Sequence, residues 1–157
     1  MPDTDAPSTL PPSIERVLRM FRALSREEKM SALVQYSRKL EPVPERFRAL
    51  DPSAFTVPEC QTRVDLFPEI DDGKLHMYAG VDAKQSPTVA AILAIILTAV
   101  NGQPPSTALA LPADFVRQIM QSVGLGAREA GLNAMVARIK RFAAEAQRQT
   151  GQSTATS

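Results

Sequence analysis

Cys60 and His76 are the two side chains of this sequence whose chemistry first suggests a function. Each is the single residue of its type in a chain of 157 residues. A lone thiol cannot form an intrachain disulfide, and one cysteine with one histidine cannot supply the about three or four ligands of a zinc site. Cys60 follows Val57-Pro58-Glu59, so we expect it at the tip of a constrained loop before a strand. The thiol could be a nucleophile or sulfur carrier, or it could be buried as a small hydrophobe.

The residues around Cys60 do not by themselves decide between these interpretations. Arg63 would favour the thiolate, whereas the adjacent Glu59 would oppose it. A Cys–His catalytic dyad would require His76 to reach the thiol, but in a hairpin turning at residues 71–73 position 76 pairs near position 68. We therefore expect His76 on the surface face of the hairpin, away from Cys60, which disfavours a Cys–His hydrolase.

The elements that must position Cys60 begin with two predicted helices and a long connection. Ser13 is the expected N-cap of the first helix, whose apolar face contains Ile14, Val17, Leu18 and Phe21. Ser25 and Glu28 form the pattern of a capping box that opens the second helix. Its expected inward residues are Met30, Leu33, Val34 and Leu40. Residues 41–58 then carry four prolines and form a connection with one helical turn around Glu45–Leu50; loops of this length are often functional.

A β-hairpin is predicted directly after Cys60. Alternating apolar residues indicate strands over Thr62–Ile70 and Leu75–Gly80, and Asp71-Asp72-Gly73 between them is a tight-turn signal. Glu69 and the two turn aspartates are expected to be solvated, and Phe55–Val57 is a candidate third strand. Helices are predicted from Pro87 to Asn101, over 112–123 and from Arg128 or Glu129 onward. This order of helices, hairpin and helices predicts an α+β fold, a small antiparallel sheet packed against several helices.

Composition and the chain ends limit the class of protein. Eighteen basic residues balance seventeen acidic ones, for a net charge of +1, which does not favour binding to nucleic acid or to a membrane surface. The longest apolar run, Val89–Val100, is too short to span a bilayer. Residues 1–12 are predicted to be a disordered proline-rich leader and 148–157 a disordered tail, with one domain over 13–147. A soluble cytoplasmic protein is the expectation, since a lone thiol suits a reducing compartment.

Four segments together resemble the SufE family of sulfur acceptors, which accompany cysteine desulfurases in iron–sulfur cluster assembly. Leu10–Ile14 opens the first helix and Leu40–Arg46 follows the second. Val57–Val64 is similar to the family's cysteine loop, with Glu59 where many members have glycine and Thr62 where serine is common. Ala127–Met135 is similar to the family's Arg-x-x-Gly-Leu-x-Ala-Met signature. The resemblance covers about residues 10 to 146.

This resemblance implies a fold like that of the NifU-type iron–sulfur scaffold proteins, and a function for Cys60. Cys60 would receive sulfur as a persulfide from a SufS-type cysteine desulfurase and pass it to an iron–sulfur scaffold. Arg128, from the signature, would support docking or the conformation of the loop. Contacts with the partner would come from five further residues: Glu59, Gln61, Thr62, Arg63 and Asp82. Pyridoxal phosphate would belong to the desulfurase, and this chain would need no metal or cofactor of its own.

The cysteine count favours a carrier within this fold. A cluster scaffold needs about three or four ligands, mostly cysteines, whereas one cysteine can carry one sulfur atom. We therefore expect an accessory protein that stimulates a desulfurase, as a monomer or a homodimer, and not an independent enzyme. The alternatives are a binding module that regulates a desulfurase without using Cys60, and a thiol-dependent enzyme. The latter would need a resolving thiol or an activating histidine near Cys60.

Overall fold

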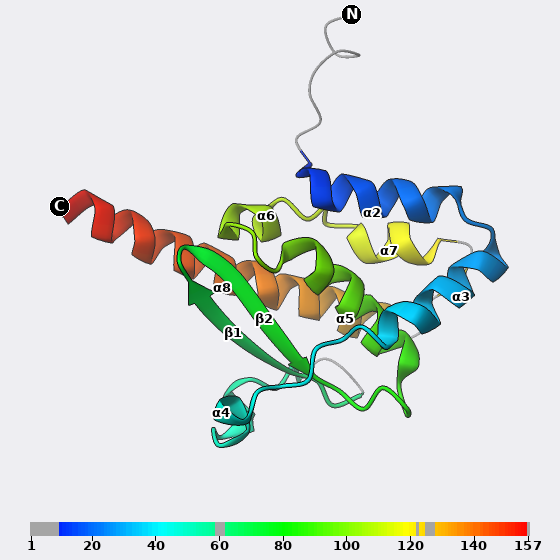
Figure 1. Cartoon of the computed structure of the whole chain (residues 1–157), viewed down its shortest axis with the longest axis horizontal. Helices are drawn as coiled ribbons and strands as arrows, with labels where there is room; N and C mark the ends of the chain where they lie inside the picture. Colours follow the sequence, from blue (N-terminus) through cyan, green and yellow to red (C-terminus); the bar gives the residue numbers. More distant parts are fainter. Residues whose placement is uncertain (1–9, 59–61, 122, 125–127, 157) are drawn as a thin grey trace, which may run out of the picture.

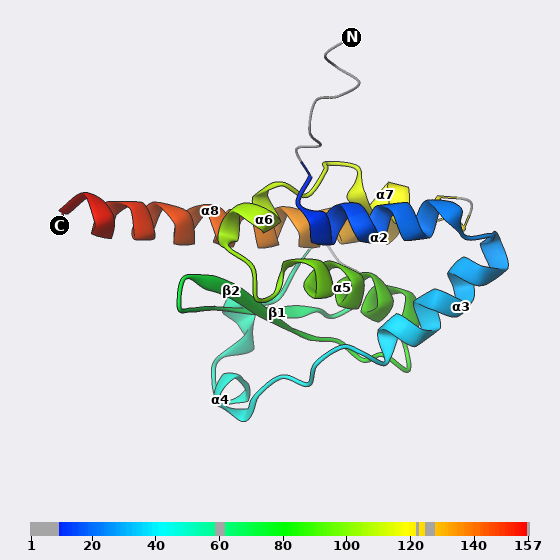
Figure 2. The same cartoon turned by 45° about the horizontal axis from the view of Figure 1, so that its top comes forward.

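The β-hairpin packs on a central apolar helix, α5 (Pro87–Val100), whose other side is covered by α2 (Pro12–Ala23), as Figure 2 shows. The computed structural model describes residues 10–58, 62–121, 123–124 and 128–156. The hairpin consists of β1 (Asp65–Asp71) and β2 (Lys74–Gly80). The remaining elements are α3 (Arg26–Ser37), α4 (Glu45–Arg48), a 3-10 turn (Pro52–Ala54), α6 (Pro105–Leu109), α7 (Phe115–Met120) and α8 (Arg128–Thr156). These elements confirm the α+β class.

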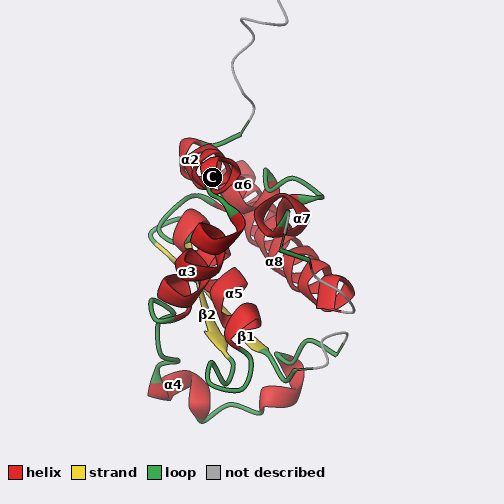
Figure 3. Cartoon of the chain, turned by 90° about the vertical axis from the view of Figure 1, so that its right-hand side faces the viewer, coloured by secondary structure: helices red, strands yellow, loops and turns green. Residues whose placement is uncertain are grey.

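The elements form successive layers, which Figures 1 and 3 show from two sides. From α2, the order is α5, then the hairpin, then α4 and the connection that carries it. α5 is apolar on nearly all sides because it lies inside this stack: of the residues from Val89 to Val100, all but Thr98 are buried. α8 is the longest helix, and its C-terminal end projects past the hairpin (Figure 1).

The hairpin has the register that its turn predicts. Asp65 pairs with Gly80 at the open end, and Asp71 pairs with Lys74 beside the turn. Asp72 and Gly73 adopt φ values of 55° and 76°, the left-handed conformation that a two-residue hairpin turn requires. In the described part of the chain, Phe55–Val57 does not extend the sheet to a third strand. It contributes one isolated bridge, between Thr56 and Asp65.

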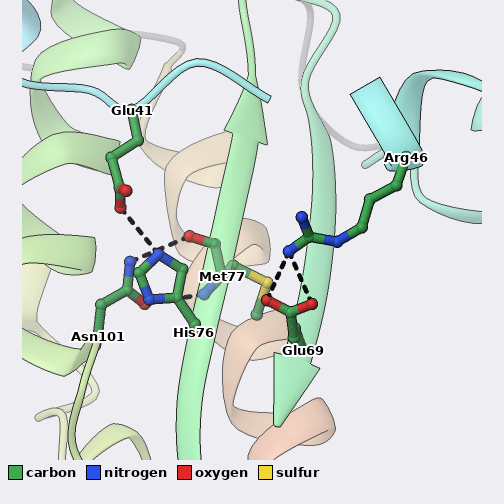
Figure 4. Close-up of polar contacts among 6 residues, drawn as sticks. All are labelled: Glu41, Arg46, Glu69, His76, Met77 and Asn101. Carbon is green, nitrogen blue, oxygen red and sulfur yellow. Dashed lines mark hydrogen bonds and ion pairs between the residues drawn. The ribbon is translucent and has the colours of Figure 1, made fainter. Parts of the chain in front are cut away.

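The outer edge of β2 is closed by the residues that follow α5. The Met77 N–H donates to Asn101 Oδ1 at 2.8 Å, and Asn101 Nδ2 donates to the Met77 carbonyl at 3.1 Å (Figure 4). Leu75 exchanges backbone hydrogen bonds with Gly102 and Gln103. The side-chain amide of Asn101 thus takes the place of a neighbouring strand, and it fixes the hairpin to the end of α5.

Two details of the first helices bear on the sequence-based expectations. α2 begins at Pro12, and Ser13 does not cap it: the Ser13 hydroxyl donates to the Ala99 carbonyl of α5 at 2.7 Å. Proline occupies the first turn readily because no intrahelical donor is required there. The capping box of α3 is confirmed, since the Ser25 N–H donates to Glu28 Oε1 and the Glu28 N–H donates to Ser25 Oγ.

The inward face of α3 is rotated from the predicted one. Leu33 is buried as expected, but Met30 and Val34 are 46% and 48% exposed. Lys29, four residues before Leu33, is only 4% exposed, and its Nζ donates to the Gln121 carbonyl at 2.6 Å. The aliphatic part of a lysine side chain can pack in a core when its ammonium group has a hydrogen-bond acceptor. A pattern of apolar residues alone therefore missed Lys29 and wrongly placed Met30 and Val34 on the inward face.

The C-terminal helices also differ in extent. α6 lies between the predicted helices that end at Asn101 and begin at residue 112, and α7 is shorter than the predicted 112–123 helix. α8 continues to Thr156, whereas the sequence predicts a tail without regular structure over 148–157. Extending an existing helix avoids the cost of nucleation, so polar residues of moderate propensity can follow it. Among the described residues, no helix is both long and apolar enough to cross a membrane.

Candidate functional site

The residues that precede and follow Cys60 in the sequence are both anchored in the structure. Glu59, Cys60 and Gln61 are outside the described residues, so their predicted roles remain predictions. On either side, the Val57 N–H donates to the Val64 carbonyl at 2.9 Å. Val57 and Val64 are 1% and 0% exposed. Val57 and Val64, two buried β-branched residues joined by this hydrogen bond, therefore form the stem of the cysteine segment, residues 58–63, ahead of the hairpin.

The stem continues into the hairpin. The Leu66 N–H donates to the Phe55 carbonyl at 2.9 Å, and the Thr56 hydroxyl donates to Asp65 Oδ1 at 2.5 Å. Arg63 Nε lies 3.4 Å from Asp65 Oδ2; the Arg63 side chain is 66% exposed and that of Asp65 is 15% exposed. One carboxylate thus joins Thr56, before the cysteine segment, to Arg63, after it.

Thr62 and Asp82, which were both predicted as partner-binding residues, are connected through Ser86. Thr62 Oγ1 and Ser86 Oγ share a hydrogen bond at 2.9 Å, and Ser86 is buried at 9% exposure. Asp82 shapes the turn that carries Ser86: Asp82 Oδ1 accepts from the Lys84 and Gln85 N–H groups, and the Asp82 carbonyl accepts from the Ser86 N–H. The return of the cysteine segment is therefore tied to the start of α5.

The segment before the stem is fastened over the outer face of the hairpin. His76 Nε2 lies 2.9 Å from Glu41 Oε1, and Arg46 donates to both oxygens of Glu69 at 2.8 and 2.9 Å (Figure 4). The hydrogen bond to Glu69 raises the pKa of Arg46. His76 lies on the outer face as predicted, but the expectation that Glu69 is only solvated is wrong. Glu69 is paired with Arg46, which lies 23 residues earlier in the sequence.

Aromatic contacts complete this attachment. The Phe47 ring lies 5.4 Å from that of Phe67 and 5.5 Å from that of Tyr78, and the Phe55 ring lies 4.9 Å from that of Phe67. The Arg46 guanidinium lies 4.9 Å from the centre of the Phe47 ring. Contacts of this kind stabilise beyond their buried area. They place the 41–56 connection so that it delivers the chain to the stem at Val57.

α8 approaches the same stem from the other side. Arg128 is its first residue, as predicted, and the side chain of Arg128 lies outside the described part of the structure. Leu132 and Met135, which both belong to the signature segment, are buried. Arg138 lies ten residues beyond Arg128, ~15 Å along the helix. Its Nη2 donates to the Ala54 carbonyl at 3.2 Å, which joins α8 to the residues that enter the stem.

An open groove of about 610 Å³ lies beside the cysteine segment, lined by Asp51, Ser53, Thr56, Pro58, Arg63 and Arg138.

Sequence patterns singled out neither Arg138 nor Ser86. Ser86 precedes Pro87 and has the pattern of an ordinary helix cap, and Arg138 has no local signal at all. Among the described residues, no group of three or more His, Cys, Asp or Glu side chains could hold a metal ion.

Comparison with known proteins identifies the class to which this fold and site belong. A family model described as SufE, Fe-S metabolism associated domain, matches residues 15–143. An uncharacterised SufE-like protein of Mycobacterium tuberculosis is 31% identical, over 90% of this chain and 98% of that protein. A second uncharacterised SufE-like protein, from Synechocystis, is 29% identical over 76% of this chain and 72% of that protein.

A solved structure shows the same fold. The solution structure of a hypothetical protein from Thermus thermophilus has a TM-score of 0.72, covering 88% of this chain and 98% of that one at 24% identity. The chain therefore belongs to the SufE family and has the fold of that family. The matched domain associates it with iron–sulfur metabolism.

Proposed function

We propose that this protein is a sulfur acceptor that takes sulfur from a cysteine desulfurase onto Cys60 and passes it to iron–sulfur cluster assembly. The observation that carries the proposal is the stem at Val57 and Val64, whose 2.9 Å hydrogen bond anchors the segment that contains the single cysteine. A thiol that accepts a group from another protein must be presented reproducibly, and an anchored stem meets that need. Membership of the SufE family supports the same role.

The transfer is a thiol–disulfide-type exchange. The Cys60 thiolate attacks the outer sulfur of the persulfide on the desulfurase cysteine. A sulfur–sulfur bond forms to Cys60 as the sulfur–sulfur bond to the desulfurase breaks, and the desulfurase cysteine leaves as a thiolate. No external oxidant or reductant is needed, because one persulfide replaces another. The pyridoxal phosphate that generates the first persulfide belongs to the desulfurase.

The residues next to Cys60 have distinct roles in this proposal. Thr62, tied to Ser86, holds the returning end of the segment. Arg63 places a cationic, exposed side chain three residues from the thiol, while Asp82 shapes the turn behind Ser86. Glu59 and Gln61 flank the thiol in sequence and would contact the desulfurase directly, with Arg128 supporting docking. The chain would act as an accessory protein and not as an independent enzyme.

Intact-mass spectrometry tests this proposal. The protein is incubated with a SufS-type desulfurase, its pyridoxal phosphate and cysteine, without reductant, beside a Cys60→Ser variant. We expect an added mass of about 32 Da per sulfur atom on the unsubstituted chain alone, together with faster turnover of the desulfurase. Equal behaviour of the two proteins would overturn the carrier role. Full stimulation by the Cys60→Ser variant would indicate a binding module that regulates the desulfurase allosterically.

A further inference from the structure

We infer that the groove beside the cysteine segment is a docking site for an acidic segment of the persulfide-donating protein. This inference rests on the proposed function: it assigns a partner chemistry to Arg63, already predicted as a partner contact, and extends the contact surface to Arg138, which lies outside the four segments of the resemblance. The groove is bordered by Pro58 on one side of residues 59–61 and by Arg63 on the other. A protein that brings a persulfide to Cys60 would therefore cover this groove.

Two guanidinium groups give the groove its chemistry. The Arg63 side chain is 66% exposed, and its ion pair with Asp65 is a single contact at 3.4 Å. Arg138 donates one N–H to the Ala54 carbonyl. A guanidinium has several donors in a planar fork that matches a carboxylate. Both arginines therefore keep donors with which to bind a carboxylate, while these existing contacts hold their side chains in place.

The cationic surface extends along α8. A second hollow, of about 210 Å³, shares Arg138 with the groove and is also lined by Ala54, Arg141 and Glu145. Arg148 lies seven residues beyond Arg141, on the same helical face. From Arg63 to Arg148 this surface holds four arginines against three acidic residues, Asp51, Asp65 and Glu145, so basic side chains outnumber acidic ones.

Asp51 is the acidic residue that lines the groove itself. Asp51 accepts the Ser53 N–H at 3.0 Å, and this backbone contact, followed by the Ser53 side chain, lowers the pKa of Asp51. The Asp51 carboxylate therefore stays ionised and is held toward its own turn, so an acidic partner segment should contact Arg63 and Arg138 and not the Asp51 end of the groove. A partner carboxylate would meet arginine donors that remain directed to the groove. Complementary charge at the edge of an interface raises the association rate and sets orientation, and salt screens it.

Binding measurements in a Cys60→Ser background test this inference without any sulfur transfer. The Cys60→Ser chain, with and without the further Arg63→Glu and Arg138→Glu substitutions, is titrated with a SufS-type desulfurase at low and high salt. Arg22→Glu is the matched control, because Arg22 is an exposed arginine of α2, on the other side of α5 from the hairpin (Figure 2). We expect the double variant to bind about tenfold more weakly at low salt, and the control to bind as before.

Arg63→Gln alone separates docking from folding. It removes the charge of a largely exposed side chain without placing a second carboxylate beside Asp65, so the thermal unfolding midpoint should stay close to that of the unsubstituted chain while the affinity falls. Hexaglutamate should compete with the desulfurase for the Cys60→Ser chain, and uncharged hexaglutamine should not. Equal affinity of the double variant and the control at low salt would overturn the inference. Persulfide formation on Cys60 is measured in a separate assay with the chain that keeps its cysteine. The docking inference and the proposed carrier function can therefore be refuted independently of each other.

Discussion

The hydrogen bond between Thr62 and Ser86 should couple the cysteine segment to α5, and a double-mutant cycle measures that coupling. Ser86 is 9% exposed, whereas Thr62 is half-buried. Thr62→Val removes the partner of a buried hydroxyl and leaves it unsatisfied, which costs about 1–3 kcal/mol. Ser86→Ala leaves the more accessible Thr62 hydroxyl, which water can reach, so its cost should be about 1 kcal/mol. Thr62→Val should therefore be the more destabilising single change.

Urea unfolding of the four proteins of the cycle gives the coupling energy. Once Ser86 is alanine, Thr62→Val has no buried hydroxyl to leave unpaired, so the double variant should be more stable than the two single costs predict, by about 1 kcal/mol. Thr62→Ser keeps a hydroxyl and serves as the matched control. If the bond also holds the segment in the arrangement that accepts sulfur, the single-turnover rate of transfer to Thr62→Val should fall by up to about fivefold.

The opposite results would refute this reasoning. Additive costs, with a coupling within about 0.3 kcal/mol of zero, would mean that Thr62 and Ser86 do not act as a pair. A Thr62→Ser variant as unstable as Thr62→Val would place the effect in the size of the side chain and not in its hydroxyl. An unchanged transfer rate in a destabilised variant would separate the stability of the stem from the reaction.

Three further predictions concern the elements that support the site. Asn101→Ala removes both hydrogen bonds to the Met77 backbone and should lower the free energy of unfolding by about 2 kcal/mol in urea titrations. Gly73→Ala puts a Cβ at a φ of +76° and should cost about 1 kcal/mol in the same assay. Hydrogen bonds from the Ser25 N–H, and then from its side chain, lower the pKa of Glu28. The capping bond therefore stabilises the protein at neutral pH, and its contribution is lost as the pH falls through that lowered pKa. An NMR titration of Glu28 should give a midpoint below the ordinary glutamate value, and Ser25→Ala should move that midpoint partly back.

The parts of the fold that could be predicted from sequence are those with a local cause. Asp72 and Gly73 provide the left-handed turn of the hairpin, and Ser25 with Glu28 provides the start of α3. The order of the predicted elements also gave the α+β class, and the last helix was expected to begin at Arg128 or Glu129; α8 begins at Arg128. Each of these features depends on a few neighbouring residues.

The parts that sequence did not predict depend on contacts between distant residues. Lys29 is buried because the Gln121 carbonyl, from another element, accepts its ammonium group. Glu69 is paired because α4 brings Arg46 over the hairpin. Ser86 and Arg138 join the site through partners that are 24 and 84 residues away in sequence. No local pattern contains that information, so the lone cysteine was visible in the sequence while the contacts that fasten its stem were not.

The most direct test of the account is the location of the transferred sulfur. The protein is incubated with a desulfurase and 35S-labelled cysteine, its free thiols are alkylated, and the chain is separated and digested with trypsin. Cleavage after Arg48 and Arg63 gives a peptide, residues 49–63, that contains Cys60. The account predicts labelled persulfide sulfur on this peptide. Turnover of the desulfurase with no label on the 49–63 peptide would contradict it.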